Sequence, residues 1–272
     1  MEAYEGFAKV YDVFMDETPY EEWGQRIRDI ITKYGISRPG LTGDNKTPLE
    51  TERDLVLDLG CGTGNMTQLL ASYGYDMIGV DCSEEMLSAA MEKREQENLP
   101  VLYLLQDMRE LELYSTVGTV ISVCDSLNYL LTSEDLLETF RRVNNYLFPG
   151  GIFIFDFNTV YKYEQVIGDA TIAEDRETCS FIWDNYYDPE NQINEYDLTL
   201  FVARQDGLYQ KYTETHYQRG YTLSAVRKIA EQAGLDWVLS MDGDTGGVVT
   251  AETERVLAVV KEQNKQENNE KR

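Results

Sequence analysis

The sequence predicts an α/β protein with a doubly wound, mostly parallel β-sheet. Segments with helical patterns separate successive short apolar runs, which is the arrangement that joins parallel strands. Glycine-rich or acidic residues follow several of these runs, and ligands of such sheets bind at the carboxyl ends of the strands. The five predicted strands of this type span residues 54–59, 75–80, 101–106, 116–124 and 148–157.

Length and composition limit the possibilities further. The chain has 272 residues, and 42% of them are hydrophobic, which is enough for one large α/β domain with an insertion. There is no run of 18 apolar residues and no signal-peptide pattern, so we expect a cytoplasmic protein without a membrane partner.

The net charge of −25 argues against nucleic acid as a partner, because binding a polyanion requires a basic surface. The acidity is explained either by solubility or by an acidic mouth that attracts an amine substrate. The four cysteines form no CxxC pair and the chain has one histidine, so we expect reduced thiols and no metal site.

A glycine-rich turn follows the first predicted strand. Gly60, Gly62 and Gly64 come at alternate positions after Asp58, and they allow a ligand to approach bare backbone. The dinucleotide fingerprint needs a glycine at the sixth position, which Asn65 occupies here. A carboxylate at position 58 is also better placed beside a cation than beside a pyrophosphate.

This turn resembles motif I, D-x-G-x-G-x-G, of the class I S-adenosylmethionine (SAM) dependent methyltransferases. The resemblance implies SAM as cofactor, S-adenosylhomocysteine as product, and a Rossmann-like, seven-stranded sheet. The residues that it places at the cofactor in this turn are Asp58, Gly60, Cys61, Gly62, Gly64 and Asn65.

Further residues extend the predicted cofactor site. Asp81 ends the second predicted strand, about 20 residues after the turn, where a carboxylate can accept hydrogen bonds from a ribose diol. By resemblance to the family, Cys82 and Met86 follow it beside the adenine. Asp107 and Met108, after the third strand, occupy the positions that contact the adenine ring in that family.

The amino-terminal segment, residues 1–35, is predicted to be helical, and Tyr4, Phe7, Tyr11 and Phe14 share one helix face. Residues 11–23 resemble the opening of a small-molecule branch of the family, in which this segment covers the cofactor. Tyr11, Tyr20 and Trp23 would then wall the site, since aromatic faces suit a sulfonium cation. The alternative is that these rings only pack against the domain.

The remaining boundaries follow from composition and pattern. Residues 36–53 are predicted to be a surface loop, 50–160 the SAM-binding core, and 161–220 an antiparallel β insertion on the substrate side. Residues 221–261 are predicted to supply a closing helix and two strands, and 262–272 a disordered tail.

The substrate side is predicted from the end of the fourth strand and from the insertion. The candidates are Asp125, which also counts as a cofactor residue, Asn128, Tyr129 and His216. Glu214, His216 and Gln218 alternate along one strand and share a face, which would be either a catalytic surface or the outer face of an edge strand.

The predicted function is methyl transfer from SAM to a nitrogen or oxygen of a small molecule. Asp125-Ser-Leu-Asn128 departs from the N/D-P-P-Y sequence of nucleic-acid amino methyltransferases of this fold, although a macromolecular substrate stays possible. The alternatives are a SAM-binding protein without activity and, less favoured, an NAD-linked oxidoreductase. Nothing in the sequence predicts the oligomeric state.

Overall fold

The computed structural model describes residues 8, 10–40, 46–263 and 265. Its larger sheet has the strand order β10-β11-β5-β4-β1-β2-β3, and only β11 runs antiparallel to its neighbours. The strands are β1 (Leu55–Leu59), β2 (Asp76–Asp81), β3 (Val101–Leu105), β4 (Val117–Ser122), β5 (Leu147–Asn158), β10 (Leu235–Asp242) and β11 (Arg255–Glu262). The predicted doubly wound, seven-stranded fold is therefore confirmed.

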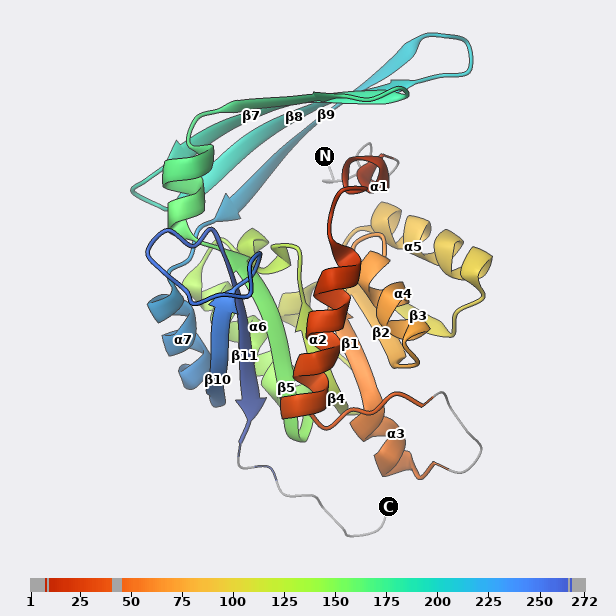
Figure 1. Cartoon of the computed structure of the whole chain (residues 1–272), viewed down its shortest axis with the longest axis vertical. Coiled ribbons are helices and arrows are strands. Elements are labelled where there is room, and N and C mark those ends of the chain that lie inside the picture. The colour runs from red at the N-terminus through yellow and green to blue at the C-terminus, as the bar shows by residue number, and fades with distance from the viewer. Residues whose placement is uncertain (1–7, 9, 41–45, 264, 266–272) are drawn as a thin grey trace.

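Helices cover both faces of this sheet (Figure 1). On one face lie α2 (Tyr20–Tyr34) and α4 (Asn65–Ser72), and on the other lie α6 (Ser133–Tyr146) and α7 (Leu223–Gln232). A fifth helix, α5 (Glu84–Glu97), packs against β2 and β3. Strand β5 shows why both faces need cover, because Phe153 and Phe155 enter one core while Ile152 and Ile154 enter the other. Each such buried side chain contributes about 1.5–3 kcal/mol.

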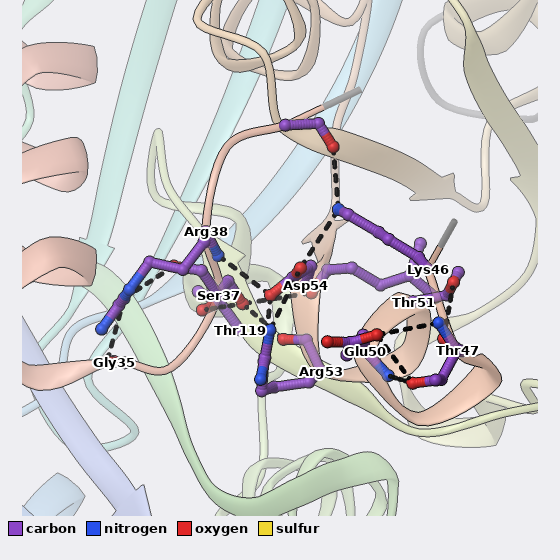
Figure 2. A network of polar contacts seen from close by, with 12 residues as sticks. Gly35, Ser37, Arg38, Lys46, Thr47, Glu50, Thr51, Arg53, Asp54 and Thr119 are labelled. Atoms are coloured by element: carbon purple, nitrogen blue, oxygen red, sulfur yellow. Dashed lines mark hydrogen bonds and ion pairs between the residues drawn. The ribbon is translucent and has the colours of Figure 1, made fainter. Parts of the chain in front are cut away.

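The prediction of a surface loop over residues 36–53 is wrong for its last part. Helix α3 (Pro48–Asp54) begins at a capping box, in which the Thr47 hydroxyl accepts from the Glu50 amide and Glu50 accepts in return. At its end, Asp54 is buried and forms ion pairs with Lys46 and Arg53 (Figure 2). Threonine, proline and glutamate in this order are a pattern that starts helices. The loop prediction is based on polar composition and does not take this pattern into account.

The insertion forms a second, four-stranded antiparallel sheet in the order β6-β7-β8-β9. Its strands are β6 (Thr171–Asp175), β7 (Cys179–Asp188), β8 (Ile193–Ala203) and β9 (Tyr209–Arg219), and a short π-helix, Lys162–Ile167, precedes them. The sequence did not predict β6, which is mostly exposed and lacks apolar alternation. This sheet lies across the carboxyl-end edge of the larger sheet (Figure 1).

The amino-terminal segment divides into two parts with different surroundings. Helix α1 (Tyr11–Phe14) lies below the four-stranded sheet, and Val10 and Phe14 pack on its inner face with Phe181 and Leu198. Helix α2 instead belongs to the core of the larger sheet through Ile27 and its neighbours. Tyr4 and Phe7, predicted to continue the α1 face, lie outside the described residues.

The carboxyl-terminal segment departs from its predicted boundary by one residue. The predicted tail includes Glu262, but this residue ends β11, and its carboxylate accepts from the Gly150 amide at 2.8 Å. Residues 264 and 266–272 lie outside the described part of the chain. Within that described part, no helix has the length and apolar character needed to span a bilayer.

Candidate active site

One cavity of about 790 Å³ lies between the larger sheet, α1 and the inner face of the four-stranded sheet. It opens beside the carboxyl ends of β1 and β4, where the chain winds to opposite sides of the sheet and where ligands of such folds bind. Its lining includes these predicted cofactor and substrate residues: Tyr11, Tyr20, Asp58, Gly60, Cys61, Gly62, Asn65, Asp81, Cys82, Met86, Asp107, Met108, Asp125 and Tyr129.

The glycine-rich turn takes a left-handed backbone at Gly60, Gly62 and Gly64, with φ of 78°, 53° and 79°. A Cβ atom at Gly60 would lie 2.7 Å from the Ser126 Cβ, whereas one at Gly62 would meet nothing within 4 Å. Gly62 therefore presents open backbone to the cavity. Gly64 is not among the residues that line the cavity, and a Cβ atom there would collide with the Tyr103 hydroxyl, so packing also requires glycine at this position; its contact with the cofactor stays a prediction.

Asp81 holds the turn from the end of β2. One carboxylate oxygen accepts from the Gly62 amide at 2.8 Å, and the other accepts from the Ser83 amide at 2.9 Å. Burial raises the pKa of Asp81, and the backbone hydrogen bonds oppose that rise. Because a carboxylate has about four acceptor positions, both oxygens keep capacity for a diol in the cavity.

Asp58 is the most deeply buried acid of the cavity wall, with 1% of its surface exposed. It accepts a hydrogen bond of 2.6 Å from the Thr67 hydroxyl of α4. Burial raises its pKa to about 7, while the Thr67 hydrogen bond opposes the rise and the charge of Asp81 adds to it. A cation in the cavity would favour its ionised form.

The end of β3 supplies the opposite wall. Asp107 caps the 3₁₀ helix Met108–Glu110. Its carboxylate also accepts hydrogen bonds from two side-chain nitrogens of Arg109, including Nε at 3.0 Å from Oδ1. The Arg109 hydrogen bonds hold the pKa of Asp107 below its ordinary value. Sequence reasoning missed Arg109, Glu85 and Gln106, which also line the cavity.

A polar cluster fastens α1 to the glycine-rich turn. Asp12 accepts from the Thr63 hydroxyl at 2.7 Å, from the Asn65 amide at 2.9 Å and from Lys93 Nζ at 2.8 Å. Burial alone would raise the pKa of Asp12, but the hydrogen bonds from Lys93, Thr63 and Asn65 bring it below the ordinary value. Asp12 was not predicted as a site residue, since one aspartate in a helical segment has no distinguishing pattern.

Two of the three predicted aromatic wall residues face the cavity. Tyr11 and Tyr20 line it, and burial raises the pKa of both phenols, so both are neutral. Trp23 is behind them: its ring makes an edge contact with Tyr20 and carries the Arg255 guanidinium 4.9 Å above its centre. Trp23 therefore does not line this cavity as the sequence predicts, and its ring lies between Tyr20 and Arg255 instead.

The loop after β4 bends sharply at two residues with left-handed backbone, Cys124 (φ 60°) and Asp125 (φ 53°). The buried carboxylate of Asp156 holds this bend by accepting from both backbone amides, at 3.0 and 2.8 Å. Arg255 pairs with Asp156 at 3.2 Å, and Gln218 donates to the Asp125 carboxylate at 2.7 Å. Asp156 and Arg255 were not predicted, because their roles depend on neighbours remote in the sequence.

Asn128 is not in the cavity, so its prediction as a catalytic residue is corrected. It is fully buried and joins β5 to β9. Its amide nitrogen donates to the carbonyls of Asn158, at 2.9 Å, and Arg219, at 2.6 Å, while its oxygen accepts from the Asn158 amide. These bonds satisfy both ends of the side chain, and they fix the 3₁₀ helix Ser126–Tyr129.

The last predicted residues form a chain behind the cavity wall. Glu214, His216 and Gln218 share the buried face of β9, as the alternation predicts, and the alternative of an exposed outer face is wrong. His216 is 2% exposed and does not line the cavity; Tyr129 and Tyr196 stand in front of it. The expectation that His216 meets the substrate directly is therefore corrected.

The cysteines of the cavity wall are neutral thiols. Cys61, Cys82 and Cys124 line the cavity and none of them forms a disulfide. Burial raises the pKa of each, that of Cys82 to about 11, and nearby aspartates add to the effect. Nucleophilic chemistry at sulfur is therefore disfavoured, since the thiolate is the reactive form.

A glycine-rich turn at a switch point, an acid at the end of the next strand and a cavity beside both are the features with which doubly wound folds bind a nucleotide cofactor. Residues 56–151 match the family model described as a methyltransferase domain. A putative methyltransferase of Geobacillus sp. (strain WCH70) is 35% identical over 259 residues, covering 95% of this chain and 99% of that protein. The chain belongs to the class I SAM-dependent methyltransferases, and its cofactor is SAM.

Two further comparisons agree. The putative methyltransferase YqeM of Bacillus subtilis (strain 168) is 35% identical over 232 residues, covering 85% of each chain. The crystal structure of an S-adenosylmethionine-dependent methyltransferase from Clostridium acetobutylicum ATCC 824 superposes with a TM-score of 0.81 and 29% identity, covering 96% of this chain and 99% of that one. The resemblance inferred from motif I is thus confirmed, and the oxidoreductase alternative is set aside.

Proposed function

We propose that this methyltransferase transfers the SAM methyl group to a nitrogen or oxygen of a small molecule held in the cavity. The observation that supports the proposal is the continuity of that cavity. It runs from the glycine-rich turn to an aromatic end formed by Trp183, Tyr196 and Phe181 of the four-stranded sheet. Its volume of about 790 Å³ lies within the range that ligand sites occupy, roughly 300–1,000 Å³.

The cofactor residues are assigned in this proposal by their positions along the cavity. Gly60 and Gly62 offer backbone to the amino-acid part of SAM, and Asp81 accepts from its ribose. Asp107 and Met108 border the adenine, together with Met86. The sulfonium then lies toward Tyr11 and Tyr20, whose ring faces attract a cation.

The reaction needs little chemical assistance from the protein. A lone pair of the acceptor forms the new bond to the methyl carbon, the carbon–sulfur bond breaks, and its electrons remain on a neutral sulfur. Holding the acceptor and the methyl group in line supplies much of the rate. Side chains of helix α1 and of the four-stranded sheet line the cavity opposite the glycine-rich turn, and a cover of this kind limits the access of water and therefore side reactions.

An amine is the acceptor that the charges favour. Among the described lining residues Arg109 is the only arginine, and no lysine lines the cavity, whereas the acids are Asp58, Asp81, Glu85, Asp107, Asp125 and Glu174. Such a lining attracts a cation. Two relatives carry names that fit: the dTDP-3-amino-3,4,6-trideoxy-α-D-glucopyranose N,N-dimethyltransferase of Streptomyces venezuelae, 32% identical over 48% of this chain, and a Streptomyces cypemycin N-terminal methyltransferase, 26% identical over 91%.

The first test is calorimetry of the purified protein with SAM, S-adenosylhomocysteine and NAD in parallel. We expect micromolar binding of the two sulfur ligands and no heat with NAD. The second test measures S-adenosylhomocysteine release with libraries of small amines, alcohols and short peptides. Turnover with small amines supports the proposal; turnover only with peptides would replace it with a macromolecular substrate, and SAM binding without any turnover would revive the inactive binding protein.

A further inference from the structure

We propose that Tyr129, His216 and Glu214 form a relay that accepts the proton released by the methyl acceptor. Tyr129 is the catalytic residue of this relay because it lines the cavity, whereas His216 and Glu214 act through it as positioning residues. The inference rests on the proposed function, because an acceptor with a hydrogen on its nitrogen or oxygen must lose that proton.

The three side chains come from separate elements and meet in order. The Tyr129 hydroxyl, at the end of the 3₁₀ helix after β4, lies 3.5 Å from His216 Nδ1 of β9. His216 Nε2 lies 3.1 Å from Glu214 Oε2. The chain therefore runs from the cavity wall to a buried carboxylate, in the order hydroxyl, imidazole, acid.

Tyr196 fixes the imidazole and extends the wall. Its ring stacks on that of His216 with 4.9 Å between centres and 13° between planes. Its hydroxyl lies 2.7 Å from that of Tyr129, and both residues line the cavity. Burial holds the pKa of Tyr196 well above its ordinary value, and therefore this phenol stays neutral.

Glu214 selects the tautomer that the relay requires. A carboxylate only accepts hydrogen bonds, so the proton of a neutral imidazole lies on Nε2 and is donated to Glu214. The lone pair of Nδ1 then points at the Tyr129 hydroxyl. In hydrolases an acid likewise orients an imidazole that takes the proton of a hydroxyl, although here the hydroxyl passes on a proton instead of attacking.

The proton balance of the step is complete. As the acceptor nitrogen or oxygen bonds to the methyl carbon, its proton moves to the Tyr129 oxygen. The proton of Tyr129 moves to His216 Nδ1, and the resulting imidazolium is stabilised by the Glu214 carboxylate. The proton leaves to solvent after the products depart, and no oxidant or second substrate is needed.

Burial argues against a purely structural role for this pair. Glu214 and His216 are 9% and 2% exposed, and Glu214 pairs across the sheet with Leu198 on a face that also carries Leu200 and the buried amides Asn185 and Asn194. Ionisable side chains buried among apolar ones cost free energy that a hydrocarbon pair would avoid. The third polar residue of the predicted set on β9, Gln218, has a different partner, since it donates to the Asp125 carboxylate.

The single histidine permits a test without substrate. In protein labelled with ¹⁵N-histidine and lacking a histidine tag, all ring signals come from His216. We expect the shifts of an Nε2-protonated ring, and we expect Glu214→Gln to abolish this preference while SAM affinity changes less than twofold. An Nδ1-protonated ring in the wild-type protein would overturn the relay, because Nδ1 could not then accept.

The kinetic test uses the first small amine or alcohol that gives turnover in the library assay. We expect His216→Gln and Tyr129→Phe to lower kcat by about 10²–10⁴-fold, the range for general base catalysis, with unchanged SAM affinity. The loss should shrink as pH rises, because hydroxide replaces the relay. Tyr196→Phe should cost less, since Tyr129 keeps its contact with His216.

Control variants and neighbouring groups complete the design. Tyr186→Phe and Thr215→Ala change exposed residues of β7 and β9, and we expect wild-type rates from both. Besides Glu214, Tyr129 and Tyr196, titratable groups near the relay include Asp125 and Tyr163, whose charges act on Tyr196. Equal kcat and an unchanged pH profile in His216→Gln would refute the relay.

Failure of the relay is distinguishable from failure of the proposed function. Absence of SAM binding or of all methyl transfer would remove the proposed function while leaving the tautomer of His216 as measured. An Nδ1-protonated ring, or turnover by His216→Gln at the wild-type rate, would remove the relay while leaving methyl transfer intact.

Discussion

The two ends of the cavity are built in different ways. At the cofactor end, the residues from the larger sheet lie within a few positions of a strand end, and backbone amides and carboxylates make the contacts, as between Gly62 and Asp81. At the substrate end, Tyr129 meets Tyr196 and His216 across separations of 67 and 87 residues. One end is made by local chain geometry and the other by long-range packing.

The difference between the two ends corresponds to two functions: binding of a cofactor that many enzymes share, and recognition of one particular acceptor. Backbone contacts at a strand end depend on glycine spacing and little on the rest of the chain, so they suit a cofactor that many enzymes share. The inner face of the four-stranded sheet is set side chain by side chain, and a change in any of them alters the shape offered to the acceptor. We therefore propose that the insertion determines the choice of substrate.

The largest expected effect is that of a side chain in the glycine-rich turn, which the local geometry of the cofactor end should not tolerate. Gly60→Ala places a Cβ 2.7 Å from that of Ser126 in a left-handed backbone, and we expect a loss of about 2–5 kcal/mol of unfolding free energy, measured by urea titration. The matched control is Gly150→Ala, which has φ of 74° but meets only Lys261 Cε at 3.8 Å. Equal losses in the two variants would mean that backbone conformation alone sets the cost.

The assignment of the ribose to Asp81 is tested next. We expect Asp81→Ala to weaken SAM binding by about 1.5–3 kcal/mol in calorimetry, because a charged acceptor is lost and the turn loses its tether. Asp76→Asn, at the opposite end of β2, should leave SAM affinity unchanged. An Asp81→Ala protein with wild-type affinity would show that the ribose lies elsewhere.

The polar contacts of α1 allow the two ends to be compared on one element, because α1 is held at both. Asp12 binds the cofactor end through Thr63 and Lys93, whereas Asp16 pairs with Arg176 beside the four-stranded sheet. We expect Asp12→Asn to weaken SAM binding by about 1 kcal/mol and Asp16→Asn by less, since isolated exposed pairs contribute little. The dissociation rate of S-adenosylhomocysteine, measured for each variant, reports how strongly α1 holds the cofactor. A larger effect of Asp16→Asn than of Asp12→Asn would mean that α1 is held mainly by its contacts at the substrate end.

The smallest expected effect is the release of a fraction of one proton from Asp58 when SAM binds. Asp58 has a pKa of about 7 in the folded protein, so part of the population is protonated near neutral pH. A bound sulfonium favours the ionised form, so SAM binding releases protons and SAM affinity rises with pH up to about 7. Calorimetry at pH 6.5 in buffers of different ionisation enthalpy measures the release, and Asp58→Asn should lower it.

The same raised pKa fixes the sign of the effect on stability. A carboxyl whose folded pKa exceeds its unfolded value, about 3.9, contributes stability that is fully present below the unfolded value. That contribution is lost as pH rises through about 7. Unfolding free energies that rise across this interval more in the wild-type protein than in Asp58→Asn would contradict the assignment.

Much of the fold could be predicted from the sequence because its signals are local. Apolar runs such as 55–59 and the acids that end them mark strands and their carboxyl ends without knowledge of the partners. Exposed elements were harder: β6 has no alternation, and α3 was concealed by polar composition despite the capping box at Thr47. In both, the pattern that places a strand or helix against a core is weak.

The sequence by itself determined the class of protein, the cofactor, and the turn formed by Asp58, Gly60 and Gly62, because these depend on backbone conformation over a few consecutive residues. Only the tertiary structure decided that Asn128 and Trp23 support the site from behind, and that His216 reaches the cavity through Tyr129. Spacing along a strand tells which face a side chain occupies. It does not tell what lies between that face and the ligand, since the packing of distant elements sets that distance.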